Sequence, residues 1–151
     1  MEAVKKEPVI FEGFIIMPYK YSVGSMASKF FIKIRDSKVI SGAKCPKCGF
    51  VNVPPRSVCP KCFSKVEELI DLSGKGTLET FTIVNYESSV QAIKPPYAIG
   101  VIKLDGADTG MTHFIGDVDA KSIKSGMKLE PVFKDKREAT IFDIEYFRPV
   151  K

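Results

Sequence analysis

The segments Cys45-Pro46-Lys47-Cys48 and Cys59-Pro60-Lys61-Cys62 contain all four cysteines of this chain. Two thiolates spaced by two residues can bind one metal ion from a tight turn, and two such turns complete a tetrahedral Zn²⁺ shell. Gly49 follows the first pair, where a tight turn favours a residue that tolerates positive φ. The spacing therefore predicts one Zn²⁺ ion per chain, bound by Cys45, Cys48, Cys59 and Cys62.

Two other uses of the cysteines fit the same spacing. A secreted protein could join them as two disulfides, but residues 1–8 mix acidic and basic side chains and lack the apolar core of an export signal. Four thiolates also suit a rubredoxin-type iron site. Either metal would leave no open coordination position, so we expect a structural rather than a catalytic site.

The composition is that of an ordinary soluble protein, with 44% hydrophobic and 27% charged residues. The longest apolar run, Phe14-Ile15-Ile16-Met17, is far shorter than the roughly 20 residues that span a bilayer. We therefore expect a cytoplasmic protein that does not associate with membranes.

The net charge of +5 is concentrated in the first half of the chain. Residues 1–71 hold 12 Lys+Arg against 7 Asp+Glu, whereas residues 72–151 hold 11 of each. A cationic cluster at the cysteine pairs could bind phosphate or an acidic partner, or could offset the negative charge of a zinc ion with four thiolates. With no acidic residue between positions 44 and 66, the cluster consists of Lys44, Lys47, Arg56, Lys61 and Lys65.

Residues 22–36 have the periodicity of an amphipathic helix, with apolar side chains along one face. Such a face usually packs in a core, but the small zinc ribbon that follows cannot cover it alone, so a partner interface is an equal interpretation. The apolar arm at residues 9–17 likewise needs its own domain or a partner to pack against. The candidate interface residues are Val23, Met26, Phe30, Phe31 and Ile34.

After Gly76 the sequence becomes rich in β-branched and aromatic residues. It predicts five strands, with a longer connection at 117–125 that holds one helical turn. This number and spacing of strands is typical of a small closed barrel of the OB type. The predicted strands are 77–86, 97–104, 111–115, 128–133 and 140–147.

The expected fold is mainly β and has three parts. An N-terminal arm and amphipathic helix occupy residues 1–38, and a four-cysteine zinc ribbon occupies residues 39–72. A five-stranded OB-fold barrel occupies residues 73–151. The metal is expected to hold the ribbon together in place of a large core.

Several short motifs accompany the cysteine pairs. They include Pro54-Pro55-Arg56, Gly74-Lys75-Gly76, Leu104-Asp105-Gly106 and Phe147-Arg148-Pro149. Together they resemble the acyl-CoA-associated OB-fold family with a rubredoxin-like zinc ribbon, from about residue 22 to the end. Members look like small partner subunits of thiolases, as in benzoylsuccinyl-CoA thiolase and archaeal thiolase/HMG-CoA synthase complexes. The resemblance implies that the ribbon and its preceding helix dock on the enzyme, and that the barrel contributes to the CoA site.

The residues themselves argue against independent catalysis. A thiolase needs a nucleophilic cysteine, and here every cysteine is assigned to the metal. His113 is the only histidine, and a structural or binding role is favoured over that of a base. With the resemblance, this predicts a non-catalytic subunit on a thiolase dimer, one copy on each thiolase subunit. The candidate CoA-binding residues are Arg56, Lys94, Tyr97 and His113.

A single-stranded nucleic-acid-binding protein is the alternative function. Zinc ribbons and OB folds both bind nucleic acids, and the isoelectric point near 9.0 fits such a partner. The barrel half is electrically neutral, however, whereas single-strand binding favours a cationic groove with stacking aromatics. Nucleic acid is therefore the less favoured partner.

Overall fold

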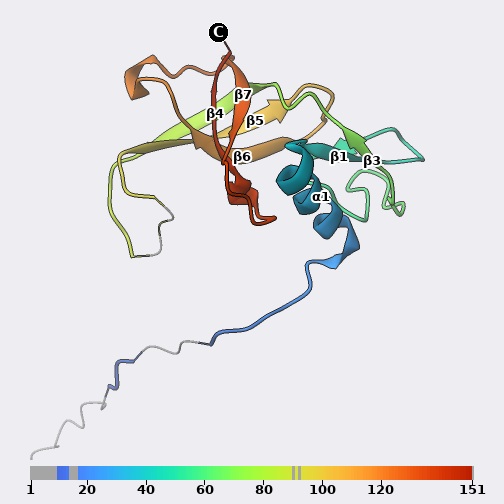
Figure 1. Cartoon of the computed structure of the whole chain (residues 1–151), viewed down its shortest axis with the longest axis horizontal. Helices are drawn as coiled ribbons and strands as arrows, with labels where there is room; N and C mark the ends of the chain where they lie inside the picture. Colours follow the sequence, from blue (N-terminus) through green and yellow to red (C-terminus); the bar gives the residue numbers. More distant parts are fainter. Residues whose placement is uncertain (1–9, 14–16, 90, 92, 151) are drawn as a thin grey trace, which may run out of the picture.

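The computed structural model describes residues 10–13, 17–89, 91 and 93–150 (Figure 1). These residues form one α-helix, a three-stranded sheet and a closed five-stranded barrel. The predicted fold class is confirmed. Within the described residues, no helix has the length and apolar character needed to cross a membrane.

The helix α1 spans Gly24–Ser37, as the periodicity predicts. It ends at Lys38, whose φ of 56° is left-handed and whose N–H donates to the carbonyl of Ile34 at 3.1 Å. This is a common way to satisfy the last carbonyls of a helix. Phe30 and Ile34 are buried on its inner face.

The ribbon sheet consists of β1 (Ser41–Lys44), β2 (Val51–Asn52) and β3 (Leu69–Asp71), in the order β2-β1-β3. Both pairings are antiparallel. A Cβ on Gly42 would lie 2.7 Å from a methyl group of Val51, so the close approach of β1 and β2 requires glycine.

The barrel has the strand order β4-β5-β6-β8-β7, and β7 pairs with β4 to close it. All pairings are antiparallel except the contact between β6 and β8. This is the five-stranded OB-type barrel that the sequence predicts. The strands are β4 (Gly76–Val84), β5 (Tyr97–Leu104), β6 (Gly110–Ile115), β7 (Lys128–Phe133) and β8 (Ile144–Pro149).

The last strand begins later than predicted, because a 3₁₀ turn, η2 (Ile141–Asp143), precedes it. The carboxylate of Asp143 accepts hydrogen bonds from the backbone N–H groups of Glu138 and Ala139 at 2.9 and 2.8 Å. These bonds hold residues 138–143 in a compact turn, so this backbone does not pair with the neighbouring strand. A second 3₁₀ turn, η1 (Ala120–Ser122), is the single helical turn expected in the long connection.

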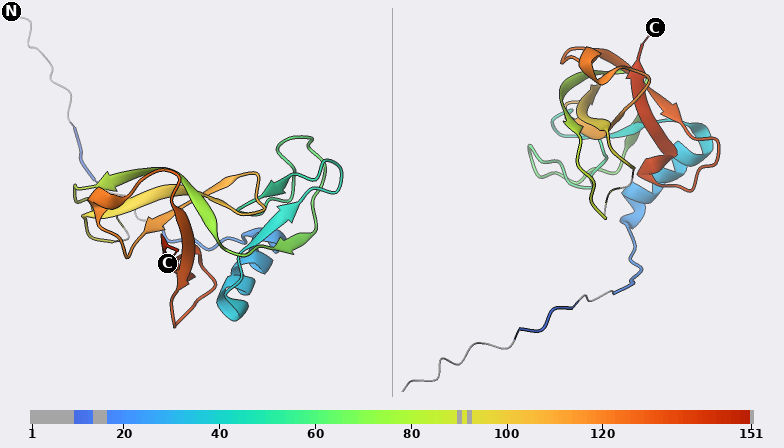
Figure 2. Two further views of the ribbon diagram at one scale, coloured as in Figure 1. Left: turned by 90° about the horizontal axis from the view of Figure 1, so that it is seen from above. Right: turned by 90° about the vertical axis from the view of Figure 1, so that its left-hand side faces the viewer.

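The helix, the ribbon and the barrel share one hydrophobic core. Figure 2 shows the helix and the ribbon strands along one side of the barrel. Phe30, Ile34 and Val53 from the first part belong to the same buried cluster as Leu78 and Leu104 from the barrel. The barrel therefore covers the helix face that the ribbon alone could not cover.

Four hydrogen bonds join the ribbon to the turn between β5 and β6. The Asp108 carboxylate accepts from the N–H of Val51 at 2.8 Å, and the Asp108 N–H donates to the Val51 carbonyl at 2.9 Å. The Thr109 hydroxyl accepts from the N–H of Val53 at 2.8 Å and donates to its carbonyl at 3.0 Å. Because Val53 is only 2% exposed, losing this partner would cost about 1–3 kcal/mol. We propose that residues 39–72 and 73–151 form one folding unit.

The shared core favours the core interpretation of the helix stripe over a partner interface. Phe30 and Ile34, 1% and 0% exposed, are covered by this chain itself. Met26 and Phe31 are partly buried and pack against the cores. Among the five candidate interface residues, only the side chain of Val23 is exposed, at 48%.

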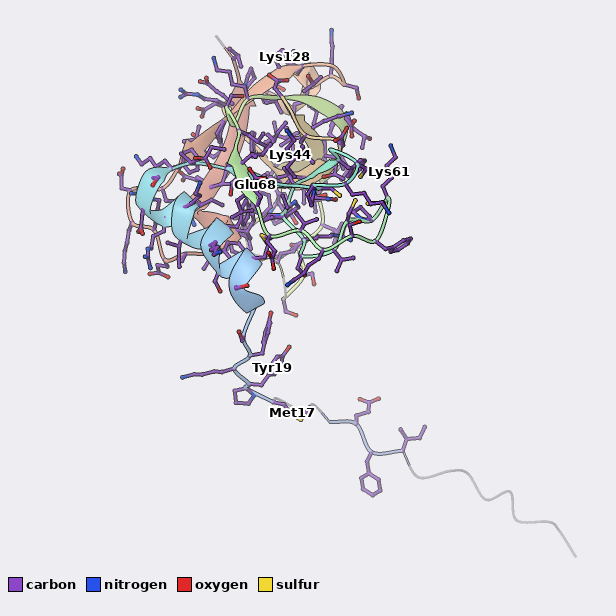
Figure 3. The ribbon with its side chains drawn as sticks, turned by 90° about the vertical axis from the view of Figure 1, so that its right-hand side faces the viewer. Met17, Tyr19, Lys44, Lys61, Glu68 and Lys128 are labelled. Atoms are coloured by element: carbon purple, nitrogen blue, oxygen red, sulfur yellow. The ribbon has the colours of Figure 1, made fainter. Side chains whose placement is uncertain are left out.

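The segment before α1 extends away from the body of the molecule, as Met17 and Tyr19 show in Figure 3. Val9 and residues 14–16 of the predicted apolar arm lie outside the described residues. Between residues 10 and 21, the described large apolar side chains are all at least 74% exposed: Ile10, Phe11, Met17, Tyr19 and Tyr21.

Candidate functional site

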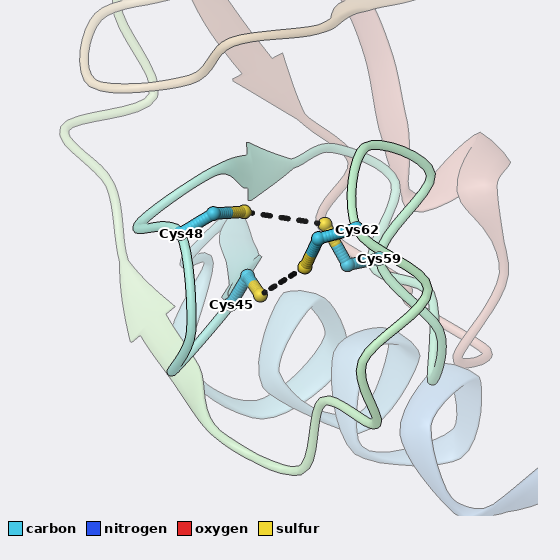
Figure 4. Close-up of side chains that lie close together, drawn as sticks. All are labelled: Cys45, Cys48, Cys59 and Cys62. Carbon is cyan, nitrogen blue, oxygen red and sulfur yellow. Dashed lines mark hydrogen bonds between the residues drawn. The ribbon is translucent and has the colours of Figure 1, made fainter.

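The four cysteine side chains converge between the two knuckles of the ribbon (Figure 4). The sulfurs of Cys45 and Cys62 are 3.5 Å apart, and those of Cys48 and Cys59 are 3.6 Å apart. All four sulfurs lie within 4.8 Å of one another. The first knuckle follows β1, and the second lies in the loop between β2 and β3.

This geometry suits a tetrahedral metal ion and not disulfides. The cysteines are free, and a disulfide would bring two sulfurs to about 2.05 Å. Zn–S bonds of about 2.3 Å place the sulfurs of a tetrahedral site roughly 3.8 Å apart, close to the distances observed. Such an ion, held by all four cysteines, would cross-link the two knuckles and leave no position for a substrate.

The thiols have different tendencies to ionise. A hydrogen bond with Ser64 is the main reason that the pKa of Cys62 falls to about 6. For Cys48 the backbone of Phe50 acts in the lowering direction, but burial and the neighbouring thiols raise the pKa to about 12. Four thiolates this close therefore need the positive charge of a metal ion, which deprotonates thiols that bind it.

The cluster also replaces a core at this end of the molecule. Cys45 and Cys59 are buried with Ala43 and Val66 as the only fully buried apolar neighbours in their cluster. Two such small side chains bury little apolar area. The ribbon therefore depends on the metal centre for its own stability, as small metal-binding modules do.

A second candidate site is a hollow of about 540 Å³ in the barrel, here called the aromatic hollow. The rings of Phe114 and Phe142 stack at its wall with centroids 6.4 Å apart and an angle of 21°. Tyr97 meets Phe114 edge to face at 5.6 Å. Most of the lining is apolar, and its residues include Ile93, Phe114, Lys134, Phe142, Ile144 and Tyr146.

His113 lies beside this hollow but does not line it. The ring is 5% exposed, and its Nε2 lies 3.2 Å from the carbonyl of Ile141, so Nε2 carries the proton and donates. Burial lowers the pKa of His113 below its usual value, which keeps the ring neutral at pH 7. The histidine therefore holds the loop that carries Phe142.

Comparison with known proteins agrees with this architecture. The profile described as "ChsH2, rubredoxin-like zinc ribbon domain" matches residues 35–68, and "ChsH2, C-terminal OB-fold domain" matches residues 69–134. A "DUF35 domain-containing scaffold protein" of Methanocaldococcus jannaschii is 35% identical over 106 residues, which cover 70% of this chain and 74% of that protein. The chain belongs to the DUF35 family.

A further relative and a solved structure carry the names of proteins from enzyme complexes. "Benzoylsuccinyl-CoA thiolase subunit BbsA" of Thauera aromatica is 35% identical over 65 residues, which cover 43% of this chain and 44% of that protein. The structure described as "Ltp2-ChsH2(DUF35) aldolase" superposes with a TM-score of 0.63 at 19% identity, covering 85% of this chain and 98% of the other. At that identity the likeness concerns the fold.

The structure brings together only some of the residues that the sequence singles out for CoA. Tyr97 contacts Phe114 of the aromatic hollow, and Lys94 follows Ile93, which lines it. Arg56 belongs to the ribbon loop after β2 and does not line the hollow. Sequence reasoning misses Phe142; an aromatic side chain directly after a charged loop is the signal that could have identified it.

Replacing Cys48 with serine tests the metal centre of this DUF35 chain. Cys48 is exposed, so the change removes one sulfur ligand with little loss of packing. We expect one zinc ion per wild-type chain by mass spectrometry of the metal content, a reduced content in Cys48→Ser, and a lower unfolding temperature, because the ribbon loses its cross-link.

The exposed Ser57 in the same loop supplies the control: Ser57→Ala should keep both the zinc and the unfolding temperature. One iron ion per chain, or no metal in freshly purified wild-type protein, would contradict the zinc assignment.

Proposed function

We propose that this chain is a non-catalytic scaffold subunit that docks on a thiolase-fold acyl-CoA enzyme and helps to form its CoA site. The observation that carries the proposal is the exposed apolar arm that precedes α1. Exposed apolar surface of this extent is typical of protein interaction sites. Aromatic side chains are also the residues that most often dominate the energy of an interface.

The relatives support the choice of partner. A "thiolase subunit" and several "scaffold" proteins are similar to this chain in sequence. None of these names describes an independent enzyme. We therefore infer a thiolase-fold partner, with one copy of this chain on each thiolase subunit. Reduced cysteines suit a cytoplasmic complex.

The chemistry of the chain favours an auxiliary role. All four cysteines belong to one cluster, so the nucleophile that a thiolase needs must come from the partner. His113 is buried and hydrogen-bonded to the backbone, and it does not line the aromatic hollow. The active site would then lie on the partner, with this chain at its edge.

The aromatic hollow supports a contact with CoA. Pockets that bind cofactors are mostly apolar with a few polar groups placed at the rim. The apolar wall at Phe142 suits an acyl or pantetheine chain, and Lys134, which lines the hollow together with Glu145, suits a phosphate. The hollow is large enough for such a chain, since pockets for small molecules begin at about 300 Å³.

The nucleic-acid alternative finds less support in the barrel. A hollow over the outer face of β4, β5 and β6 is lined by threonine, glycine and apolar residues, with Phe81 as its aromatic side chain. No lysine or arginine belongs to this lining. Binding of a single strand favours a cationic groove with several stacking rings, so this surface is poorly suited to it.

Co-expression with a thiolase-fold enzyme encoded beside this chain tests the docking proposal. The wild-type chain should co-purify as a stable complex, and Phe11→Gln combined with Tyr19→Gln should reduce the amount recovered at least about tenfold, as expected for interface aromatics. Both side chains are exposed, so the fold and the zinc content should not change.

A matched control replaces Glu12 and Lys20 with glutamine in the same segment. These exposed residues carry charge but little apolar area, so the complex should persist. Two results together would refute docking. The wild-type chain would run as a monodisperse monomer, and the thiolase-fold enzyme encoded beside it would be fully active without it.

Phe142→Ser tests the CoA contact in the purified complex. The ring is 46% exposed, so its loss should leave the barrel folded while removing part of the hollow's apolar wall. We expect the KM for CoA in the thiolysis assay to rise about fivefold with a smaller change in kcat, the pattern of lost binding. Tyr86→Ser, an exposed aromatic that does not line the hollow, should leave KM unchanged. Equal KM values in all three proteins would exclude a contact of CoA with the hollow.

A further inference from the structure

The second cysteine knuckle contains a bulky residue in a strained backbone conformation. Phe63 directly follows Cys62 and has a φ of +60°. The left-handed region is uncommon for residues other than glycine, asparagine and aspartate, and it is unusual for a bulky side chain. It destabilises such a residue by about 1–2 kcal/mol.

The first knuckle shows what this position requires. Gly49 occupies the equivalent place after Cys48, with a φ of +73°. The two turns close with the same hydrogen bond: Gly49 N–H to Cys45 carbonyl at 3.0 Å, and Phe63 N–H to Cys59 carbonyl at 2.9 Å. Glycine adopts this conformation without a steric penalty, so the turn itself gives no reason for phenylalanine.

Packing within the chain gives no reason either. The Phe63 side chain is 80% exposed, and it belongs to neither of the two buried clusters nor to the apolar residues packed against them. Val58 in the same loop is also exposed. Phe63 thus combines a strained backbone with an aromatic ring exposed to water. Neither buried cluster of the described residues offsets these two unfavourable features.

Each of the two knuckles carries one exposed lysine between its cysteines. Lys61 precedes it by two residues in the same turn, and Lys47 has the equivalent position in the first knuckle. Both are exposed, and neither forms an ion pair with a described residue, whereas Lys65 pairs with Glu67 at 2.5 Å. Figure 3 shows Lys61 at the opposite edge of the ribbon from α1.

We propose that Phe63 anchors the second knuckle in an apolar pocket with an acidic rim on the partner protein. The inference rests on the proposed function and adds a contact at the metal end of the ribbon, separate from the arm. An aromatic anchor within a polar rim is the usual anatomy of an interface hot spot, and lysines at the rim match acidic residues opposite. Two contacts on different elements fix the orientation of the subunit, which one contact cannot do.

A protein partner fits this feature better than a nucleic acid. Binding of single strands depends on several rings that stack successive bases along a groove. Here a single exposed ring, that of Phe63, lies in the second knuckle. The outcome with nucleic acid is therefore part of the test.

Phe63→Gly separates docking from folding, because glycine relieves the strain while removing the ring. We expect unchanged zinc content, an unfolding temperature equal to or above that of the wild type, and an affinity for the co-purified thiolase-fold enzyme at least about tenfold lower. Phe63→Asn should lower the affinity in the same way, since asparagine tolerates the left-handed region without supplying a ring. Tyr86→Gly, at a similarly exposed aromatic, should not change the affinity.

The charges are tested by Lys47→Glu combined with Lys61→Glu, which should weaken binding and reduce its dependence on salt. Wild-type affinity in both Phe63 variants would overturn the anchor while the proposed function stands. A wild-type chain that does not bind the enzyme overturns both. Tight binding of a short single-stranded DNA that is lost in Phe63→Gly would assign the ring to nucleic acid and overturn the protein pocket.

Discussion

The joint between the zinc ribbon and the barrel is the constraint on which the rest of the structure depends. The ribbon alone buries only a few small apolar side chains beside its cysteines. The barrel supplies the core against which Phe30 and Ile34 pack, and Asp108 and Thr109 bind Val51 of β2 and Val53 just after it. The metal would hold the two knuckles to each other, whereas the joint holds the ribbon on the barrel.

If the proposed function holds, this joint would let a small subunit act as a scaffold. The second knuckle and the aromatic hollow lie on different elements, and a rigid joint between ribbon and barrel would keep these two surfaces in one arrangement. Docking surfaces that are held by rigid elements lose less entropy when a partner binds. The same rigidity would place the hollow at a fixed position beside a partner's active site.

The sequence predicts what depends on local pattern and misses what depends on distant contacts. The cysteine spacing predicts the convergence of four sulfurs, and alternating apolar residues predict five strands in nearly their observed positions. The partners of Val51 and Val53 lie 57 and 56 residues away, and no periodicity indicates them. For the same reason the helix stripe is equally consistent with a core and with a partner: an apolar face indicates that it will be covered, but not by which surface. No sequence pattern indicates the strain at Phe63, because that strain is a property of the backbone.

The most direct test of this account is the ¹⁵N relaxation of backbone amides in the zinc-loaded full-length chain, which reports how each part tumbles. If the joint makes one rigid body, amides in the strands of the ribbon (β1, β2 and β3) and of the barrel (β4 to β8) will give the same rotational correlation time, while residues before Gly24 will relax faster. A shorter correlation time for the ribbon than for the barrel would show two bodies on a hinge and would contradict the account.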